Sequence, residues 1–368
     1  MKIGFFTMPV HRLGRNYTEC LQEDRDAIIL ADKLGFSEAY VGEHLTDAAE
    51  SITNAMLFQA SLISETKQIK LGTGTTNLSH THPVLVAAQA AMLDHLLQGR
   101  FIFGISPGAL ESDAEALGIR GLDRNQMFAE SITHILDIWG GEPPYDLRGK
   151  RWKISTGETL MPEIGLGSIA KPFQKPHPPI VCTVVAPFSK GVIEMGKRGF
   201  LPISANFLLD KWVKTHWDNY SQGCEESGRK ASPEDWRVAR SIFVHDDHKT
   251  AIDYGKKHER SPYRFYFKQL YTKLKKANRH TVFKPEKNFP DEELNLDYIV
   301  DNLVIAGDIN SVVDQILAFR EITGDFGTLL YAGTDWEDKE LSKRSMELMA
   351  TKVMPAINLA IGQSGATG

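Results

Sequence analysis

Short apolar runs alternate along most of the chain with longer segments in which apolar residues recur every three or four positions. This pattern predicts strands that alternate with helices, which is the repeating unit of a parallel α/β fold. Eight strand–helix units can be read in order, and this number favours a closed (β/α)8 TIM barrel over an open doubly wound sheet. The predicted strands are residues 2–7, 38–42, 69–75, 100–105, 180–185, 201–204, 237–245 and 328–331.

The predicted helices lie between these strands. Two further segments read as insertions into one domain of residues 1–368: 140–179 after the fourth helix, which contains the hairpin YDLRGKRWKI, and 259–297 around the seventh helix. The helices are expected at about 18–34 with Thr18 as the cap, at 53–66, from Pro83, at 125–139, from close to Ser189 as a cap, at 209–227, from near Lys249, at 309–323 and at 338–361.

Polar and glycine-rich residues cluster where three predicted strands end. Because strand ends in an α/β barrel face the active site, we expect these residues to meet at one polar mouth. The GxG at 72–74 lacks a third glycine and opens no helix, which argues against a dinucleotide fingerprint. The clusters are Glu43 and His44, then Gly74, Thr75, Thr76 and Asn77, then Ser106, Pro107 and Gly108.

Composition narrows the class of partner. The formal net charge of −5 gives no electrostatic footprint for nucleic acid, and no apolar stretch is long enough to span a membrane. The N-terminal apolar run breaks at Pro9 and reads as a strand, not as a signal peptide. Three widely separated cysteines without CxxC spacing fit a reducing cytoplasm. A small-molecule partner is therefore expected.

Five motifs occur in an order that resembles the bacterial luciferase-like family of flavin-dependent monooxygenases, especially its limonene-monooxygenase-like and diketocamphane-monooxygenase-like members. The resemblance covers nearly the whole chain. The motifs are EH at 43–44, LGTGTTNLSHTHP at 71–83, GRFIFGISPGALESDAEALGI at 99–119, TVVAPFSKGVIEMGKRGFLPIS at 183–204 and DNLVIAGDINSVVDQILAF at 301–319.

The resemblance implies a TIM barrel that binds reduced FMN, reacts it with O2 and transfers one oxygen atom to a small apolar substrate such as a terpene, cyclic ketone or aldehyde. It also implies a separate flavin reductase that supplies the reduced FMN, and a homodimer formed through the alanine-rich helices at 53–66 and 83–97. For the alanines themselves, packing against the barrel is the alternative. Two other functions remain open: a deazaflavin-dependent oxidoreductase of the same superfamily and a non-catalytic flavin-binding protein.

The same resemblance assigns catalytic residues. His44, with Glu43 beside it, lies next to the isoalloxazine, where an imidazole can act as a general acid or base. A histidine that is only hydrogen-bonded in the rim is the alternative. Leu45 stands where luciferases carry a second histidine, which argues against luminescence. Gly74 and Thr75 occupy the place of a non-prolyl cis peptide bond under the flavin.

Further cofactor contacts follow from the resemblance. Ser189, Lys190 and Gly191 match the loop that holds the FMN phosphate, a chemistry suited to backbone N–H groups at a helix start. Ser106 faces the flavin where luciferases have a cysteine. Four polar residues are candidates for the polar ring edge or the ribityl chain, with simple rim pairing as the alternative: Asn77, Thr183, Ser204 and Asn206.

Two remaining features have competing interpretations. The pair His80 and His82 raises a metallohydrolase hypothesis, but later strands offer no clear ligand set, so no metal is expected. The aromatic residues of the second insertion either line a lid over the active site or pack an amphipathic helix onto the barrel exterior; they are Tyr263, Phe265, Tyr266, Phe267 and Tyr271.

Overall fold

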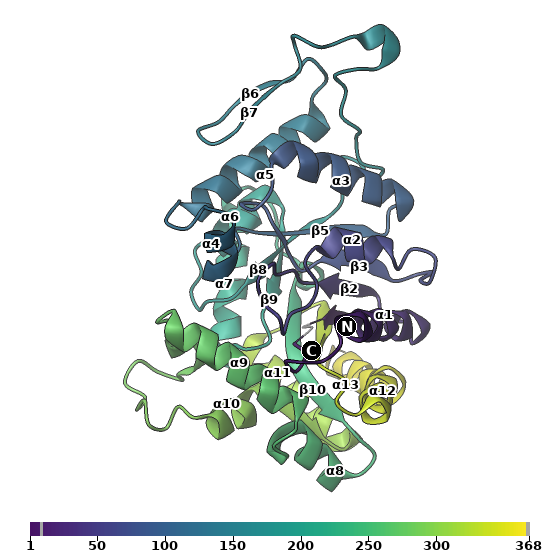
Figure 1. The fold of residues 1–368 in the computed structure, drawn as a ribbon. Coiled ribbons are helices and arrows are strands. Elements are labelled where there is room, and N and C mark those ends of the chain that lie inside the picture. Colours follow the sequence, from purple (N-terminus) through teal and green to yellow (C-terminus); the bar gives the residue numbers. More distant parts are fainter. Residues whose placement is uncertain (8–9, 366–368) are drawn as a thin grey trace. The chain divides into compact units, whose positions relative to one another are not determined.

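The computed structural model describes residues 1–7 and 10–365 (Figure 1). The chain forms two compact units, one made of Met1–Ala39 with Thr183–Gly368 and the other of Tyr40–Cys182. Strands β2 (Glu38–Val41) and β8 (Ile180–Val184) lie where the chain passes between these units. The single domain over residues 1–368 stays a prediction.

The sheet of the first unit is parallel and runs in the order β11, β10, β12, β1, with β9 also paired to β10. Lys2 lies opposite Thr328, and all of β12 is buried. Near-continuous burial is typical of parallel strands covered on both faces. The strands are β1 (Lys2–Thr7), β9 (Leu201–Ser204), β10 (Arg237–Val244), β11 (Val304–Gly307) and β12 (Thr328–Gly333).

Helices α6 and α7 of this unit pack with their backbones in close approach. A Cβ added at Gly223 would lie 2.0 Å from the carbonyl oxygen of Ile193, so only glycine fits there. The helices of the unit are α1 (Tyr17–Lys33), α6 (Gly191–Arg198), α7 (Asp210–Glu226), α8 (His248–Ile252), α9 (Pro262–Lys276), α10 (Leu296–Leu303), α11 (Ile309–Thr323), α12 (Lys339–Leu348) and α13 (Met354–Gly365).

Strand β5 (Phe101–Ser106) is central in the second unit, where it pairs in parallel with β3 (Lys70–Thr73), β4 (Thr76–Asn77) and residues 180–182 of β8. Helices α3 and α5 lie side by side in this unit (Figure 1). Its first insertion carries the predicted hairpin as the antiparallel pair β6 (Asp146–Arg148) and β7 (Lys153–Ser155). The helices are α2 (Ala55–Ala60), α3 (Pro83–Leu96), α4 (Glu111–Ala116) and α5 (Arg124–Gly140).

All eight predicted strands occur, and β1, β9 and α11 have the predicted bounds. Short elements that were not predicted include β4, β11, α4 and α10. Helices of six to eight residues have little stability of their own, so tertiary packing decides whether they form. Among the described residues, no helix is long and apolar enough to cross a membrane.

Several predicted boundaries were wrong. Asn16, not Thr18, caps α1, because its side chain accepts the N–H of Glu19. Helix α2 ends at Ala60, far short of residue 66, and Ser61 donates its hydroxyl back to the carbonyl of Phe58 at 2.6 Å. The last predicted helix is divided into α12 and α13 by a π-helical turn at Met349–Val353.

Candidate functional site

His44 follows β2 in the second unit, and its ring lies between two carboxylates. Its Nδ1 is 3.1 Å from Oδ2 of Asp113, and its Nε2 is 3.4 Å from Oε2 of Glu50. Because a carboxylate only accepts hydrogen bonds, Nδ1 carries a proton, and Nε2, which faces Glu50, is the nitrogen at which a second proton can be gained or lost. The side chain of His44 is about one quarter exposed (24%), so the ring is both held and reachable.

Asp113, on α4, holds this histidine from a buried position. Its Oδ1 accepts the N–H groups of Leu45 and Thr46 and the Thr46 hydroxyl, at 3.1, 2.9 and 2.6 Å. Burial opposes the charged carboxyl group, but the bonds from His44 and Thr46 outweigh it and lower the pKa of Asp113 to about 2. Asp113 is therefore a carboxylate at neutral pH.

Glu43 has a different position from its neighbour. Its two carboxylate oxygens accept the backbone N–H groups of Ala55 and Asn77, each at 2.9 Å, and burial raises its pKa in spite of these bonds. The first of these donors is at the start of α2. Glu43 thus ties the end of β2 to α2 and β4.

The next two strand ends join the same network. Ser106 accepts the hydroxyl of Thr75 at 2.7 Å and the N–H of Gly108 at 3.2 Å, and donates to the side-chain oxygen of Asn77 at 2.8 Å. The amide of Asn77 donates to the Glu43 carbonyl at 3.3 Å. The Gly74–Thr75 peptide bond is cis. The predicted meeting of three polar strand ends is confirmed within this unit.

Sequence reasoning missed Asp113 and Glu50 in this unit. Asp113 lies inside a motif that carried the family resemblance, but its distance of 69 residues from His44 gave no local sign of the pairing.

In the first unit, the cradle loop (residues 186–191) connects β8 to α6. The N–H groups of Ser189, Lys190 and Gly191 have no hydrogen-bond acceptor within the part of the chain that is described. Ser189 was expected to be the N-cap of α6, and this expectation was wrong. Helix α6 begins at Gly191, and Lys190 occupies the cap position without a side-chain bond. Three free N–H groups at a helix start form an anion-binding arrangement.

His216 on α7 fixes the start of the cradle loop. Its Nε2 lies 2.9 Å from the carbonyl oxygen of Ala186, and its Nδ1 lies 2.8 Å from the hydroxyl of Ser204. Burial lowers the pKa of His216 to about 4, so the ring is neutral, donating from Nε2 and accepting at Nδ1. Ser204 also accepts the indole N–H of Trp236 at 2.9 Å, so its hydroxyl makes one bond as donor and one as acceptor within the protein.

The other ligand candidates of this unit are placed differently. Asn206 donates to Ser241 at 2.9 Å and accepts from the hydroxyl of Tyr266 at 3.1 Å, and it is buried. Thr183 lies on β8 and is partly exposed. Tyr263, Tyr266 and Phe267 of α9 are buried, so this helix turns an aromatic face toward the protein interior. Both interpretations of the second insertion require such a face.

The two histidines of the HxH pair have separate environments. His82 is exposed and caps α3, with its Nδ1 accepting the N–H of Val84 at 3.3 Å. The ring of His80 lies against Gly108, where an added Cβ would come within 2.6 Å of its Nε2. The two side chains therefore have different surroundings, one at a helix start and one against a glycine.

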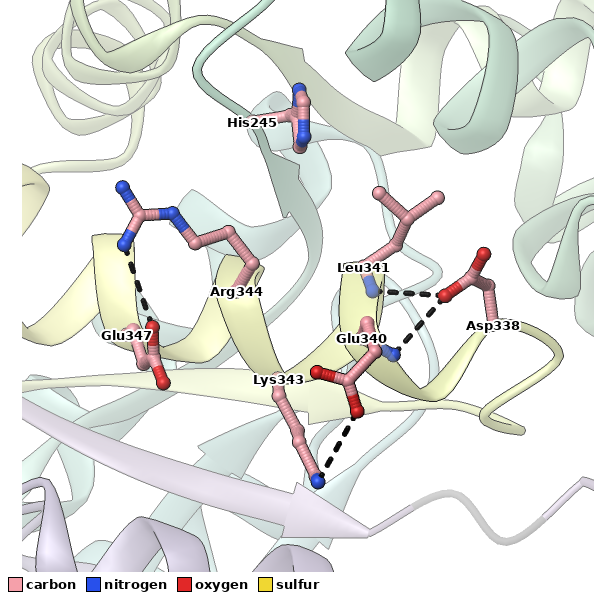
Figure 2. Close-up of a pocket in the computed structure, with 7 residues that line it drawn as sticks. All are labelled: His245, Asp338, Glu340, Leu341, Lys343, Arg344 and Glu347. Carbon is pink, nitrogen blue, oxygen red and sulfur yellow. Dashed lines mark hydrogen bonds and ion pairs between the residues drawn. The ribbon is translucent and has the colours of Figure 1, made fainter.

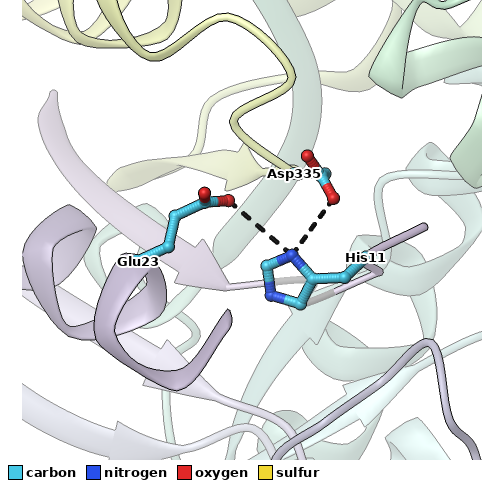
Figure 3. Close-up of side chains that lie close together, drawn as sticks. All are labelled: His11, Glu23 and Asp335. Carbon is cyan, nitrogen blue, oxygen red and sulfur yellow. Dashed lines mark hydrogen bonds and ion pairs between the residues drawn. The ribbon is translucent and has the colours of Figure 1, made fainter. Parts of the chain in front are cut away.

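Another charged cluster, in the first unit, surrounds His11 (Figure 3). Its ring nitrogens lie 3.2 Å from carboxylate oxygens of Asp24 and Asp335, and 3.6 Å from Glu23. Burial disfavours the charged ring, but the bonds to Asp24 and Asp335 outweigh it and raise the pKa of His11 to about 9. Arg15 pairs with both Glu23 and Asp335, at 2.8 and 2.9 Å. A proton and a guanidinium thus occupy the places that a metal ion would need.

A polar pocket of about 380 Å³ lies beside α12 in the first unit (Figure 2). Its charged groups are paired within the protein: Lys343 with Glu340, and Arg344 with Glu347. Asp338 caps α12 by accepting the N–H groups of Glu340 and Leu341. No residue predicted from the sequence to bind a ligand lines this pocket, and its side chains have structural partners.

Comparison with known proteins places the chain in a family. Residues 1–325 match the model of the luciferase-like monooxygenases. The chain is 30% identical to 4-hydroxyprotoasukamycin monooxygenase of Streptomyces nodosus subsp. asukaensis, over 97% of this chain and 92% of that protein. It is 27% identical to limonene 1,2-monooxygenase of Rhodococcus erythropolis, over 98% and 87%.

A solved structure extends the likeness to the fold. It is the FMN complex of the oxygenating constituent of 3,6-diketocamphane monooxygenase from Pseudomonas putida, a type II Baeyer-Villiger monooxygenase, with a TM-score of 0.86 and 27% identity over 97% of this chain and 98% of that one. The fold class predicted from the sequence, a (β/α)8 barrel, is thereby confirmed. The chain belongs to the luciferase-like monooxygenase family.

Proposed function

We propose that this protein is the oxygenase component of a two-component system that uses reduced FMN and O2 to oxygenate a small apolar organic compound. The names of its relatives support a terpene or a cyclic ketone, with an aldehyde as a third class. In the balanced reaction, one oxygen atom enters the substrate and the other leaves as water, with two electrons and two protons from reduced FMN.

The observation that carries this proposal is His44 between Asp113 and Glu50. When bound, reduced FMN supplies the electrons that activate O2, and the protein must deliver or accept protons. The carboxylate of Asp113 fixes the tautomer of His44, so Nε2 exchanges the proton. Carboxylates on both sides also stabilise the imidazolium form of the ring.

Glu43 enters the proposal as a positioning residue. Both of its oxygens accept backbone N–H groups, which fixes the chain direction at the end of β2 and thereby the place of His44. The hydroxyls and amide of Thr75, Ser106 and Asn77, with the Gly74 backbone, are proposed to contact the isoalloxazine.

For the phosphate of FMN we propose the cradle loop. The unpaired N–H groups of Ser189, Lys190 and Gly191 fit an anion, and the Ser189 hydroxyl adds a donor. Thr183, partly exposed on β8, is proposed as a contact to the same cofactor.

We further propose a homodimer and a cytoplasmic location. Apolar side chains on α2 and α3 are strongly exposed, and those of α3 recur along one face at positions 85, 92 and 96; the exposed fractions are 73% for Leu57, 53% for Leu85, 58% for Met92 and 52% for Leu96. A second copy of the chain would cover this stripe. Ala87, Ala90 and Ala91 are buried, which supports for these three the alternative that they pack against the barrel. Three free buried cysteines suit a reducing compartment.

The test is His44→Ala, measured with a panel of limonene, a bicyclic diketone and a long-chain aldehyde. We expect FMN binding to persist and product formation per reduced FMN to fall about 100- to 10,000-fold, because only the proton transfer is lost. His95→Ala, an exposed histidine at the end of α3, is the matched control. Unchanged product formation in His44→Ala contradicts the assignment, and a preference for deazaflavin over FMN in the wild type contradicts the cofactor.

A further inference from the structure

One face of α7 holds the cradle loop along its length. Thr215, His216 and Asn219 lie on this face, one helical turn or less apart. Thr215 accepts the N–H of Phe188 at 3.0 Å, His216 donates to the carbonyl of Ala186 at 2.9 Å, and Asn219 donates to the carbonyl of Ser189 at 2.9 Å. The loop is thus bonded to α7 on one side, while its N–H groups at 189–191 stay free on the other.

Trp212, at the N-terminal end of the same face, makes contacts in two directions. Its ring packs edge to face against Phe188, with centroids 5.6 Å apart at 63°. Its indole N–H donates to the carbonyl oxygen of Lys284 at 3.0 Å. Lys284 belongs to the insertion arm (residues 280–291), the part of the second insertion that follows α9. A single side chain therefore joins the cradle loop to the insertion arm.

Phe188 makes this junction sensitive to the backbone of the loop. Its φ of 53° is in the left-handed region, which a bulky side chain rarely adopts, and its side chain is 64% exposed. Relaxation of this residue to the ordinary region would turn its ring away from Trp212. An anion bound by the N–H groups of 189–191 would fix the adjoining backbone and favour the left-handed state.

Within the described chain, the insertion arm also contacts the body of the unit through aromatic rings: His280 packs against Tyr271 and Phe289 against Tyr298 of α10, with centroids 6.2 and 4.8 Å apart. Phe283 is buried against Phe207 and Tyr271, with ring centroids 6.4 and 6.1 Å apart. The side chain of Lys284 bonds within the arm, to the carbonyl of Phe289 and to Asp291. Loss of the Trp212 bond would leave the backbone at Lys284 without its partner on α7.

We propose that Trp212 is a positioning residue that couples phosphate occupancy of the cradle loop to the docking of the insertion arm. This inference rests on the phosphate assignment made above for the same loop. FMN therefore stabilises the arm in its docked position, and riboflavin, which has no phosphate, does not. Because coupling is reciprocal, the docked arm also strengthens the binding of FMN.

The test is hydrogen–deuterium exchange of amides 281–289 in the full protein, measured without ligand, with FMN and with riboflavin. We expect FMN to slow exchange in the arm at least threefold in the wild type and riboflavin to leave it unchanged. Trp212→Phe keeps a ring against Phe188 but removes the indole donor, so FMN should no longer protect the arm. Because the coupling is reciprocal, the affinity for FMN should fall by no more than the factor by which FMN slows exchange of the arm in the wild type. Trp217→Phe is the matched control, since Trp217 lies on the same helix but its ring pairs with Tyr220 and Trp236, whereas Trp212 pairs with Phe188.

The outcomes separate the two proposals. Full FMN protection of the arm in Trp212→Phe, or no protection in a wild type that binds FMN, overturns the coupling. Equal protection by riboflavin and FMN, with equal affinities for both, overturns the phosphate assignment instead. Circular dichroism of each variant checks that it is folded. Thr215→Val is a second, independent variant: it removes the acceptor of the Phe188 N–H, so FMN should protect the arm less in this variant too.

Discussion

Replacement of Asp113 by Asn tests the central arrangement of the candidate site with almost no change in shape. The amide oxygen can still accept the N–H groups of Leu45 and Thr46 and the Thr46 hydroxyl. The amide nitrogen then faces Nδ1 of His44, where it is a donor. Nδ1 must become the acceptor, so the proton moves to Nε2 and the histidine is held in the other tautomer.

Two magnitudes follow from the structure. In Asp113→Asn, we expect product formation to fall about 100- to 10,000-fold, the range for loss of an acid or base or of its correct tautomer. The folded protein also loses the advantage of a carboxyl whose pKa is lowered to about 2 from 3.8. That difference corresponds to about 2 kcal/mol of stability at neutral pH. Because the pKa of Asp113 is lower in the folded protein than in the unfolded chain, its contribution to stability is complete above about pH 4 and is lost as the pH falls toward 2.

The assay is single-turnover product formation from pre-reduced FMN and O2, together with the melting temperature. For a chain of this length, about 2 kcal/mol corresponds to a drop of roughly 3 °C. Ser112→Ala is the matched control, since Ser112 is the neighbouring residue and its hydroxyl lies 2.7 Å from that of Thr46, to which it can donate while Thr46 donates to Asp113. A rate within threefold of the wild type, with the expected melting shift present, would refute the role of Asp113 in holding the tautomer.

Three further predictions test the other proposals. Ser189→Ala should weaken FMN about 10- to 100-fold more than riboflavin in equilibrium titrations, because one bond to a charged group is lost, and equal effects contradict the phosphate assignment. His11 has a raised pKa of about 9, so its ion pairs stabilise the fold fully below pH 6.5 and lose this effect as the pH rises through 9. The melting temperature should therefore fall more between pH 6.5 and 9.5 in the wild type than in His11→Gln. Equal falls in the two proteins would contradict the role of these ion pairs. Met92→Glu should shift a dimer toward monomer in light scattering while Gln89→Glu, one turn before it, does so less; a monomeric wild type at micromolar concentration removes the dimer proposal.

The features that could be predicted from the sequence depend on regular local geometry. Parallel strands bring their carboxyl ends to one edge, so the polar residues at the ends of β2, β4 and β5 had to meet, and Glu43, Asn77 and Ser106 do. The period of apolar residues likewise gave β9 and α11 their observed bounds. In such cases the chain near a residue largely determines its position.

The partners of the key histidines could not be predicted in the same way. Asp113 reaches His44 because α4, a helix of six residues, packs where it does, and such a short helix leaves little periodic signal. His216 is 30 residues from the carbonyl of Ala186 that it binds, and its role depends on the packing of α7 beside α6. Hydrogen bonds that join distant segments depend on tertiary packing, which a single sequence does not express locally.

Burial separates the roles of adjacent residues that the sequence presents as one motif. Glu43 and His44 are consecutive, yet the carboxylate of Glu43 is enclosed and both its oxygens accept backbone N–H groups, so a change of its proton would break the bonds that align the strand end. His44 is bonded to Asp113 through one nitrogen, keeps the other near a partly exposed carboxylate and remains reachable. A group can exchange protons during a reaction only if its loss or gain of charge leaves the surrounding fold intact. Of the two, only His44 satisfies this condition, and the cost of moving its proton is reduced by a carboxylate that stays charged beside it.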